Sequence, residues 1–460
     1  MTDPRLADLA RRAPETRLLT EPSDLEHYGR DWTRRWTPAP LAIALPSTAG
    51  DVQAIVRWAR EHQVAIVPSG GRTGLSGGAV AAHGELVVAF DRMNQVLGFD
   101  PVDATLTVGP GIALEAVQNA AREHGLAYPV DFAARGSCSI GGNIATNAGG
   151  IRVIRYGLTR QWVAGLKFVT GTGELLELNR GLVKNASGYD LRHLVIGSEG
   201  TLGMVVEATL WLAPPPPPTH VMLLAVPAMD ALMRVFAVAR VKLQLEAFEF
   251  FTDRALEHVL AHGAQAPFDV LSPYYVVAEF DAGDEASQAA ALDMFEACLE
   301  AGWVTDGVIS SSDAQAASLW RLREGITESL ARYKPYKNDI SVRIGAVPAF
   351  MADMHGLLAR EYPTFDVVWF GHIGDGNLHI NVLKPDELDQ ESFVAQCEVV
   401  TKHLAAMLHK HGGSISAEHG IGLVKKPYLE GTRSHEEIAL MRGIKAVLDP
   451  DGIMNPGKVL

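Results

Sequence analysis

The sequence predicts an α+β protein with two main domains and a short C-terminal segment. Apolar patterns typical of strands and of amphipathic helices alternate along the chain, and five consecutive prolines interrupt this alternation near the middle. With 460 residues, 47% of them hydrophobic and 20% charged, the chain has the composition of a globular protein that is long enough for more than one core.

The first half has the order expected of a mixed α/β domain. Residues 41–45 form an apolar run typical of a buried strand, residues 51–62 carry apolar side chains on one helical face, and residues 64–67 are apolar again. The same criteria predict strands at 86–90 and 105–108, a helix at 114–124 and a hairpin at 166–178.

The run Pro214–Pro218 marks the expected domain boundary, because consecutive prolines form a stiff extended segment and fit neither a helix nor a central strand. Beyond it, strands are expected at 222–225 and 274–280, and helices at 286–301 and 314–333. The expected domains are 1–213, with a linker at 214–218, then 219–410, and finally a C-terminal segment at 411–460.

Composition and charge exclude several classes of function. A formal net charge of −14 without a continuous basic tract argues against nucleic acid as a ligand. Because the overall charge is negative, an anionic small substrate would have to be bound by a few cationic side chains placed near it. Three widely spaced cysteines indicate neither an iron–sulfur cluster nor a disulfide framework. No apolar run approaches the roughly 18 residues of a membrane span, and residues 1–17 resemble no targeting segment, so we expect a cytoplasmic protein.

Three glycine-rich runs, at 70–78, 141–150 and 197–203, lie in the first domain. The first follows an expected strand and has five glycines in nine positions, so its backbone N–H groups can approach a phosphate closely. It lacks the Gly-x-Gly-x-x-Gly spacing of a Rossmann loop. A Walker-like string at 452–458 is rejected, because Val459 replaces the magnesium-binding hydroxyl.

A candidate metal site lies in the second half. Residues 367–370 and 378–382 are typical of the two strands of a hairpin, which places His372 and His379 at its two edges. Together with the distant Glu418, they form a set that suits a catalytic zinc or a similar divalent ion. His419 is then the expected base, because a metal-bound imidazole has lost the lone pair that a base requires.

Several of these motifs together resemble the FAD domain of vanillyl-alcohol-oxidase-like flavoproteins, namely residues 68–79, 137–150, 184–191 and 197–203. With residues 371–381, 417–422 and 455–458, the resemblance narrows to the FAD-dependent D-2-hydroxyacid dehydrogenases. Members that act on D-2-hydroxyglutarate are most similar, because Gly-Ser-Cys at 136–138 precedes the second glycine run here as it does there.

The resemblance implies a VAO/PCMH-type FAD-binding domain, an α+β substrate (cap) domain and a C-terminal segment that returns to the flavin. FAD is expected to be non-covalent, because relatives with covalent flavin have a histidine where this chain has Arg72 and Thr73. The residues that match the family's FAD contacts are Pro68, Ser69, Gly70, Gly71, Arg72, Thr73, Gly74, Ser76, Gly77, Ser137, Gly141, Gly142, Asn143, Thr146, Asn147, Ala148, Gly149, Glu199, Gly200, Gly203, Asn455 and Lys458.

The substrate implied by the resemblance is a small anionic 2-hydroxy acid. Arg323 and Thr327 share a face of the helix expected at 318–333, and with Lys337 they match the residues that hold the substrate carboxylate in the family. Asn381 projects from the same face of its strand as His379 and is a further candidate contact.

The expected reaction is hydride transfer from D-2-hydroxyglutarate to flavin N5, which gives 2-oxoglutarate, while His419 accepts the hydroxyl proton. D-lactate or glycolate is the alternative substrate. Zinc is the expected metal, and manganese and cobalt accept the same ligands. The resemblance implies an external electron acceptor, such as an electron-transfer flavoprotein or a quinone, and allows a homodimer.

Two hypotheses from other classes stay open at this point: a zinc hydrolase that happens to contain glycine loops, and a flavin-carrying electron relay without a substrate site. Colour separates them, because a hydrolase lacks a flavin spectrum. A relay is yellow, but the hydroxy acid does not bleach it.

Overall fold

The computed structural model describes residues 3–460 and divides into two compact units. The first unit contains the described residues up to Gly150, Tyr156–Pro215 and Glu418–Leu460, and the second contains Ile151–Arg155 and Pro216–Ala417. The border therefore falls within the proline run. The units differ from the expected domains in two places: the C-terminal return begins at Glu418 rather than at residue 411, and residues 151–155 belong to the second unit.

The first sheet of the first unit has the strand order β1-β2-β4-β3. Strands β2 and β3 both run parallel to β4, and helix α3 connects them, which confirms the predicted β-α-β order. The apolar face of α3 is buried against this sheet. The elements are α1 (Pro4–Arg12), β1 (Arg17–Leu19), α2 (Pro22–Tyr28), β2 (Ala42–Leu45), α3 (Ala49–His62), β3 (Ile66–Ser69) and β4 (Leu86–Ala89).

The second sheet of this unit is antiparallel and has the order β5-β6-β9-β7-β8. The predicted strand 105–108, helix 114–124 and hairpin 166–178 are present here as β6, α4 and β7–β8. The elements are β5 (Val96–Asp100), β6 (Thr105–Val108), α4 (Leu114–Glu123), α5 (Ile140–Thr146), α7 (Thr159–Trp162), β7 (Val163–Thr170), β8 (Leu175–Leu178), α8 (Arg192–Val195), β9 (Gly203–Trp211), η3 (Lys426–Gly431) and α15 (His435–Leu448).

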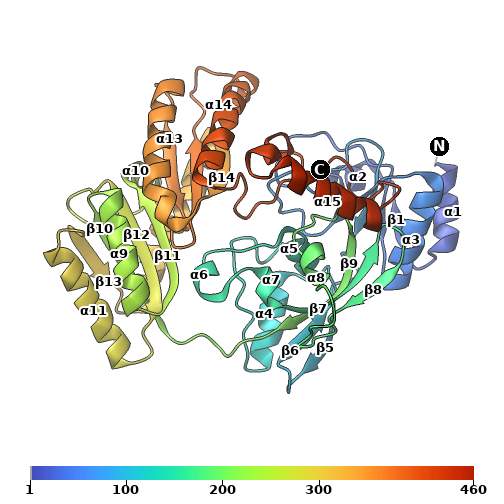
Figure 1. Ribbon diagram of the computed structural model, residues 1–460, viewed down its shortest axis with the longest axis horizontal. Helices are drawn as coiled ribbons and strands as arrows, with labels where there is room; N and C mark the ends of the chain where they lie inside the picture. Colours follow the sequence, from blue (N-terminus) through green and yellow to red (C-terminus); the bar gives the residue numbers. More distant parts are fainter. Residues whose placement is uncertain (1–2) are drawn as a thin grey trace. The chain divides into compact units, whose positions relative to one another are not determined.

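The second unit is built on an antiparallel sheet of order β13-β10-β12-β11-β15-β16-β14. Helices α13 and α14 lie side by side, as do α9 and α11 (Figure 1). The elements are β10 (Thr219–Val226), α9 (Met229–Lys242), β11 (Leu245–Thr252), α10 (Asp253–Ala261), β12 (Tyr274–Asp281), α11 (Glu285–Glu300), β13 (Asp306–Ile309), α12 (Asp313–Leu330), η1 (Ala331–Tyr333), β14 (Tyr336–Ser341), η2 (Ile344–Ala346), α13 (Val347–Glu361), β15 (Val367–Gly371), β16 (Asn377–Val382) and α14 (Gln390–His411). Helix α6 (Val153–Tyr156) begins in this unit and ends in the first.

Helix α12 covers one side of this sheet. Its residues Leu319, Leu322, Ile326 and Leu330 are buried in one cluster with Phe370 of β15 and other sheet residues. The helix therefore presents its Arg323 to the same layer in which the predicted metal ligands of β15 and β16 lie.

Candidate functional site

The first glycine run follows β3 directly. Neither the run nor the segment after it, up to residue 85, forms a helix. A Cβ on Gly71 would lie 2.0 Å from the carbonyl oxygen of Ser137, and one on Gly70 would lie 2.2 Å from Ser139 Oγ. A contact this short with backbone is sterically impossible, so only glycine at position 71 allows the first run to pack against residues 137–139, just before the second run. The two predicted cofactor segments are thus in direct backbone contact.

Arg72 adopts a left-handed conformation with φ of 59°. Its guanidinium donates to the carbonyl of Gly70 at 2.7 Å and to Asp91 at 3.2 Å, and it lies 4.5 Å from the ring centre of Tyr28. The side chain is therefore held by its own loop and by two neighbours. Because its guanidinium is already paired, Arg72 can contribute to phosphate binding mainly through its backbone, which lies in the glycine-rich turn.

A buried carboxylate that the sequence analysis missed fixes the far end of this loop. Asp31 Oδ2 accepts a hydrogen bond from the N–H of Gly77 at 2.7 Å, and Asp31 Oδ1 accepts one from the N–H of Thr33 at 3.0 Å. Asp31 is 3% exposed, and burial raises the pKa of its carboxyl above the usual value. A single acidic residue in a tryptophan- and arginine-rich segment gives little sequence signal for such a role.

The first part of the second glycine run is a helix, and only residues 147–150 are irregular. Residues 140–146 form α5, whose N-cap Ser139 accepts from the N–H of Gly142 at 3.3 Å. The helix ends at Asn147, which is left-handed with φ of 51°. Glycine has low helix propensity, which is why periodicity alone did not predict this helix. The small side chains keep the surface of α5 close to its backbone.

The third run and the C-terminal segment meet at Glu199. Its carboxylate accepts from the N–H groups of Ile421 at 2.7 Å and Gly422 at 2.8 Å, and burial raises its pKa. Asn455 Nδ2 donates to the carbonyls of Gly78 and Glu199 at 2.9 and 2.8 Å. The side chain of the predicted flavin residue Glu199 therefore binds the C-terminal segment at residues 421–422. Through Asn455, the same segment also contacts the first and third glycine runs.

The predicted cofactor residues fit a dinucleotide in two respects. Asn143 Nδ2 and Asn455 Oδ1 are among the buried polar atoms that have no hydrogen-bond partner within residues 3–460. Buried polar atoms are normally paired, so these two are suited to a bound ligand. Lys458 is also buried, and burial lowers the pKa of its ammonium group. The remaining predicted residues lie in the same three runs, except for Pro68 and Ser69 at the end of β3 and Ser137 shortly before the second run.

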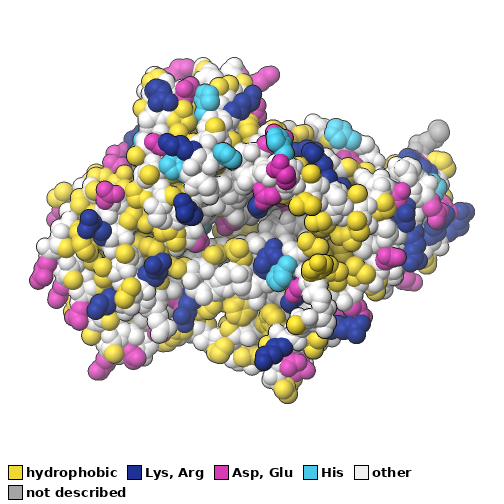
Figure 2. Space-filling model, viewed as in Figure 1, with side chains coloured by type: hydrophobic (Ala, Val, Ile, Leu, Met, Phe, Trp, Pro, Cys, Tyr) yellow, Lys and Arg dark blue, Asp and Glu magenta, His cyan; other side chains and the backbone are white. Residues whose placement is uncertain are grey.

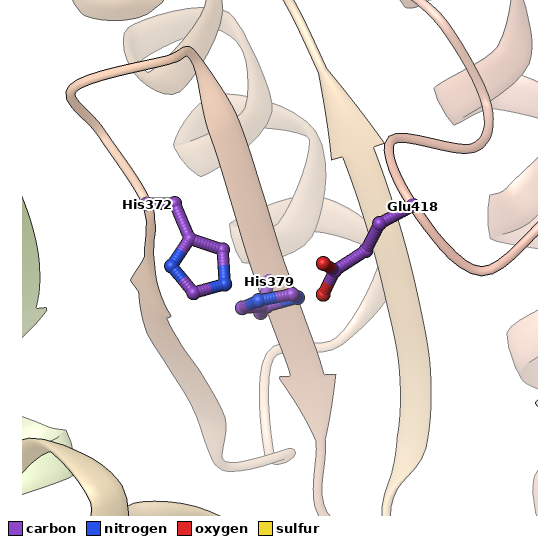
Figure 3. A group of neighbouring side chains, drawn as sticks. All are labelled: His372, His379 and Glu418. Carbon is purple, nitrogen blue, oxygen red and sulfur yellow. The ribbon is translucent and has the colours of Figure 1, made fainter. Parts of the chain in front are cut away.

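The three predicted metal ligands come together. Ligand atoms of His372, His379 and Glu418 all lie within 4.8 Å of one another, and Figure 3 shows their side chains directed toward one another. His372 follows β15, His379 lies in β16, and Glu418 directly follows Ala417, the last residue of the second unit. The predicted hairpin is confirmed, because Phe370 pairs with His379 across β15 and β16.

A second set of possible ligands shares Glu418. Ligand atoms of Asp339, Glu418 and His419 also lie within 4.8 Å of one another. The predicted base, His419, is therefore close enough to the predicted carboxylate ligand to be a ligand itself. Its Nε2 lies 3.8 Å from Glu418 Oε1. This geometry fits His419 both as a base and as a metal ligand.

Each histidine of the first set has a carboxylate behind it, and neither carboxylate was predicted. His372 Nδ1 lies 2.7 Å from Glu249 Oε1, and His379 Nδ1 lies 3.8 Å from Asp339 Oδ1. Metal-binding histidines usually donate their second N–H to such a group. The sequence carries little signal for Glu249, which stands out only as an acidic residue between Phe248 and Phe250, and the buried strand β11 that contains it was not predicted.

The predicted substrate residues lie in the same layer. Lys337 in β14 is paired with Asn381 in β16, and Asp339 with His379, so these four side chains share one face of the sheet. Asn381 is buried. Lys337 keeps an exposed surface, but the protein around its ammonium group removes part of its hydration and lowers its pKa. The strand that contains Lys337 was not predicted from the sequence.

Arg323 is a buried residue. Its Nη2 lies 2.8 Å from Glu249 Oε2, and its guanidinium carbon lies 4.8 Å from the ring centre of Phe370. Thr327, one turn later on α12, is exposed. The structure thus connects Arg323 to His372 through Glu249.

Comparison with known families identifies the kind of protein. Residues 40–179 match the family model described as FAD binding domain, and residues 215–459 match the C-terminal domain of FAD linked oxidases. The chain belongs to the FAD-linked oxidase family. This FAD-linked oxidase is therefore an FAD-dependent oxidoreductase, as the glycine runs and their resemblance predicted.

Individual relatives agree with this assignment. The FAD-linked oxidase is 73% identical over 459 residues to "D-2-hydroxyglutarate dehydrogenase" of Xanthomonas citri pv. viticola, covering 100% of this chain and 97% of the relative. It is 38% identical to "D-2-hydroxyglutarate dehydrogenase, mitochondrial" of Bos taurus, covering 99% and 83%. The predicted resemblance to FAD-dependent D-2-hydroxyacid dehydrogenases is confirmed.

The fold is confirmed as well. The solved structure of p-cresol methylhydroxylase with substrate bound has a TM-score of 0.76 and 15% identity, covering 100% of this chain and 97% of that chain. At this identity the likeness concerns the VAO/PCMH-type fold alone. Within residues 3–460, none of the helices combines the length and apolarity of a membrane span. On the face shown in Figure 2, basic and acidic side chains are intermixed.

Proposed function

We propose that this FAD-linked oxidase oxidises D-2-hydroxyglutarate to 2-oxoglutarate with the help of a divalent metal, and that it passes the electrons to an external acceptor. The observation that carries the proposal is the convergence of His372, His379 and Glu418, with Arg323 connected to the same network through Glu249. The names of the relatives support the substrate.

FAD, when bound, supplies the acceptor for the hydride, and a divalent cation supplies Lewis acidity toward the substrate's oxygen atoms. His372, His379 and Glu418 are the residues that would hold the cation, and zinc is the metal that such a set most often binds. The glycine runs and Asn143, Asn455 and Lys458 would hold FAD without a covalent bond.

The other residues bind substrate and move a proton. His419 accepts the proton of the substrate hydroxyl, which is possible only while its imidazole stays off the metal. Lys337 and Asn381 face the substrate from neighbouring strands, and Arg323 offers a buried cation to its distal carboxylate. A monocarboxylate such as lactate or glycolate, the alternative substrate, has no group for a second cation.

The decisive experiment is anaerobic bleaching of the purified flavoprotein with a panel of D- and L-2-hydroxy acids. We expect D-2-hydroxyglutarate to bleach the flavin fastest. Faster bleaching by D-lactate or glycolate would select the alternative, and a yellow protein that none of them bleaches would select the electron relay. An electron-transfer flavoprotein or quinone as acceptor, a cytoplasmic location and a homodimer remain part of the proposal.

A further inference from the structure

The carboxylate of Glu249 is shared between two predicted functional residues. Glu249 is 1% exposed, its Oε1 lies 2.7 Å from His372 Nδ1, and its Oε2 lies 2.8 Å from Arg323 Nη2. Burying an ionised carboxylate is costly unless its partners compensate the charge. Oε1 is hydrogen-bonded to His372, and Oε2 is ion-paired with Arg323 but has no hydrogen-bond partner within residues 3–460. Because both partners meet at one buried carboxylate, the positions of Arg323 and His372 depend on each other.

The strand register explains this arrangement. Phe250 of β11 pairs with Gly371 of β15, which places Glu249 opposite His372 on one face of the sheet. Arg323 reaches the same carboxylate from α12, where its guanidinium lies over Phe370. Three different elements therefore meet at one buried side chain.

Arg323 keeps a donor available. Its Nε is a buried atom without a hydrogen-bond partner within the described chain, whereas Nη2 faces Glu249. A guanidinium has donors in a fixed planar fork, so Arg323 can hold Glu249 with one edge and an anion with another. An anionic substrate group bound there changes the charge felt by Glu249.

We propose that Glu249 is a positioning residue that holds His372 for metal binding and couples it to the anion clamp at Arg323. This inference rests on the proposed function, because it takes His372 as a metal ligand. A carboxylate that accepts from Nδ1–H fixes the tautomer in which Nε2 carries the lone pair for the metal. Glu249 thereby sets the orientation of His372, while Arg323 holds Glu249 in place.

The test measures the affinity of the metal-depleted, FAD-loaded enzyme for zinc, by competition with a chromophoric chelator. In Glu249→Gln we expect zinc binding to weaken roughly 10- to 100-fold, as is usual when the partner of a metal-bound histidine is lost. The visible spectrum of bound cobalt should also change, because it reports ligand geometry. Glu249→Asp keeps the charge but is too short for both partners, so it should weaken zinc binding too.

Glu279→Gln is the matched control. Glu279 lies in the neighbouring strand β12, is 4% exposed and pairs with Arg152 at 3.0 Å, so it is also a buried, ion-paired glutamate. This variant should lose thermal stability without weakening zinc binding. Arg323→Lys should weaken zinc binding less than Glu249→Gln, whereas Arg152→Lys should leave it unchanged.

The outcomes separate this inference from the proposed function. If His372→Ala loses zinc while both folded Glu249 variants bind it as tightly as the parent, the positioning role of Glu249 is wrong and the metal site stands. If Arg323→Lys has no effect on zinc binding, the coupling is wrong. If His372→Ala also binds zinc normally, the proposed metal site fails and the inference fails with it.

Discussion

Asp31 and Gly77 are joined by a buried hydrogen bond of 2.7 Å from the backbone N–H of Gly77 to the aspartate carboxylate. Gly77 is left-handed, with φ of 79°, and ends the part of the first glycine run that is predicted to hold FAD. The contact ties that run to the segment before β2. It gives a backbone loop a fixed shape before any ligand binds.

We expect Asp31→Ala to weaken FAD binding by roughly 5-fold or more, because an unpaired buried N–H costs about 1–3 kcal/mol and loosens the loop. The dissociation constant of FAD, measured by flavin fluorescence after deflavination and reconstitution, checks this. Asp100→Ala is the control, since Asp100 also accepts two backbone N–H bonds, but in an exposed turn. Equal FAD affinity in both variants would contradict the prediction.

Removal of the metal should stop the reaction without removing the flavin. We expect chelator-treated enzyme to keep its yellow colour and lose turnover roughly 100-fold or more, because a Lewis acid supplies several kcal/mol of transition-state stabilisation. His379→Ala should lose the metal, as measured by elemental analysis, whereas the exposed His435→Ala should keep it. Full turnover after complete chelation would show that the reaction needs no metal.

His419→Ala tests which of two neighbouring side chains is the base. If Glu418 is the ligand, the variant should retain metal and FAD, and its flavin reduction rate should fall roughly 10²- to 10⁴-fold, the usual effect of losing a general base. Stopped-flow bleaching with D-2-hydroxyglutarate and metal analysis of the same sample are the measurements. Loss of the metal would instead favour the ligand set of Asp339, Glu418 and His419.

Asp366, which precedes β15, gives a stability prediction with a defined pH dependence. Burial alone raises the pKa of its carboxyl, but hydrogen bonds from His258 and Arg254 outweigh burial and lower the pKa to about 2. A depressed pKa contributes stability that is present above the usual value of 3.8 and is lost as the pH falls toward 2.

Asp366→Asn should therefore lower the free energy of unfolding by about 1–2 kcal/mol at neutral pH, after allowance for partial solvent exposure. Urea unfolding at neutral pH and at about pH 2.5 measures the difference, which should shrink at the lower pH. Asp269→Asn, at an exposed position of the same unit, should show no such change. A difference that stays constant with pH would rule out this ion pair as the cause.

Helices α3 and α12 were predictable from the sequence because each buries one apolar face, and the hairpin at 367–382 was predictable because two apolar segments flank a glycine-rich turn. The two histidines of that hairpin and Glu418 were predictable for a different reason, because few residue types bind metals. Helix α5 was not, because its glycines and small residues carry no periodic signal.

The partners behind the site were also beyond sequence analysis. Glu249, Asp339 and Asp31 act through contacts with residues far away in the chain, and only the strand register brings the first two to the histidines. Arg323 was predicted only in part. Its helix and face were predicted, but its pairing with Glu249 depends on β11, a strand that was not predicted.

Lys337 offers the cleanest test of substrate choice, because it is exposed and can be replaced without leaving a buried charge. A charge-assisted hydrogen bond contributes about 1.5–3 kcal/mol, so Lys337→Met should raise KM for D-2-hydroxyglutarate by roughly 10- to 150-fold. KM for D-lactate should change little, since lactate lacks the distal carboxylate. Lys242→Met, at an exposed position on α9, is the control. Equal losses for both substrates would mean that Lys337 does not recognise the distal carboxylate, and the lactate or glycolate alternative would gain support.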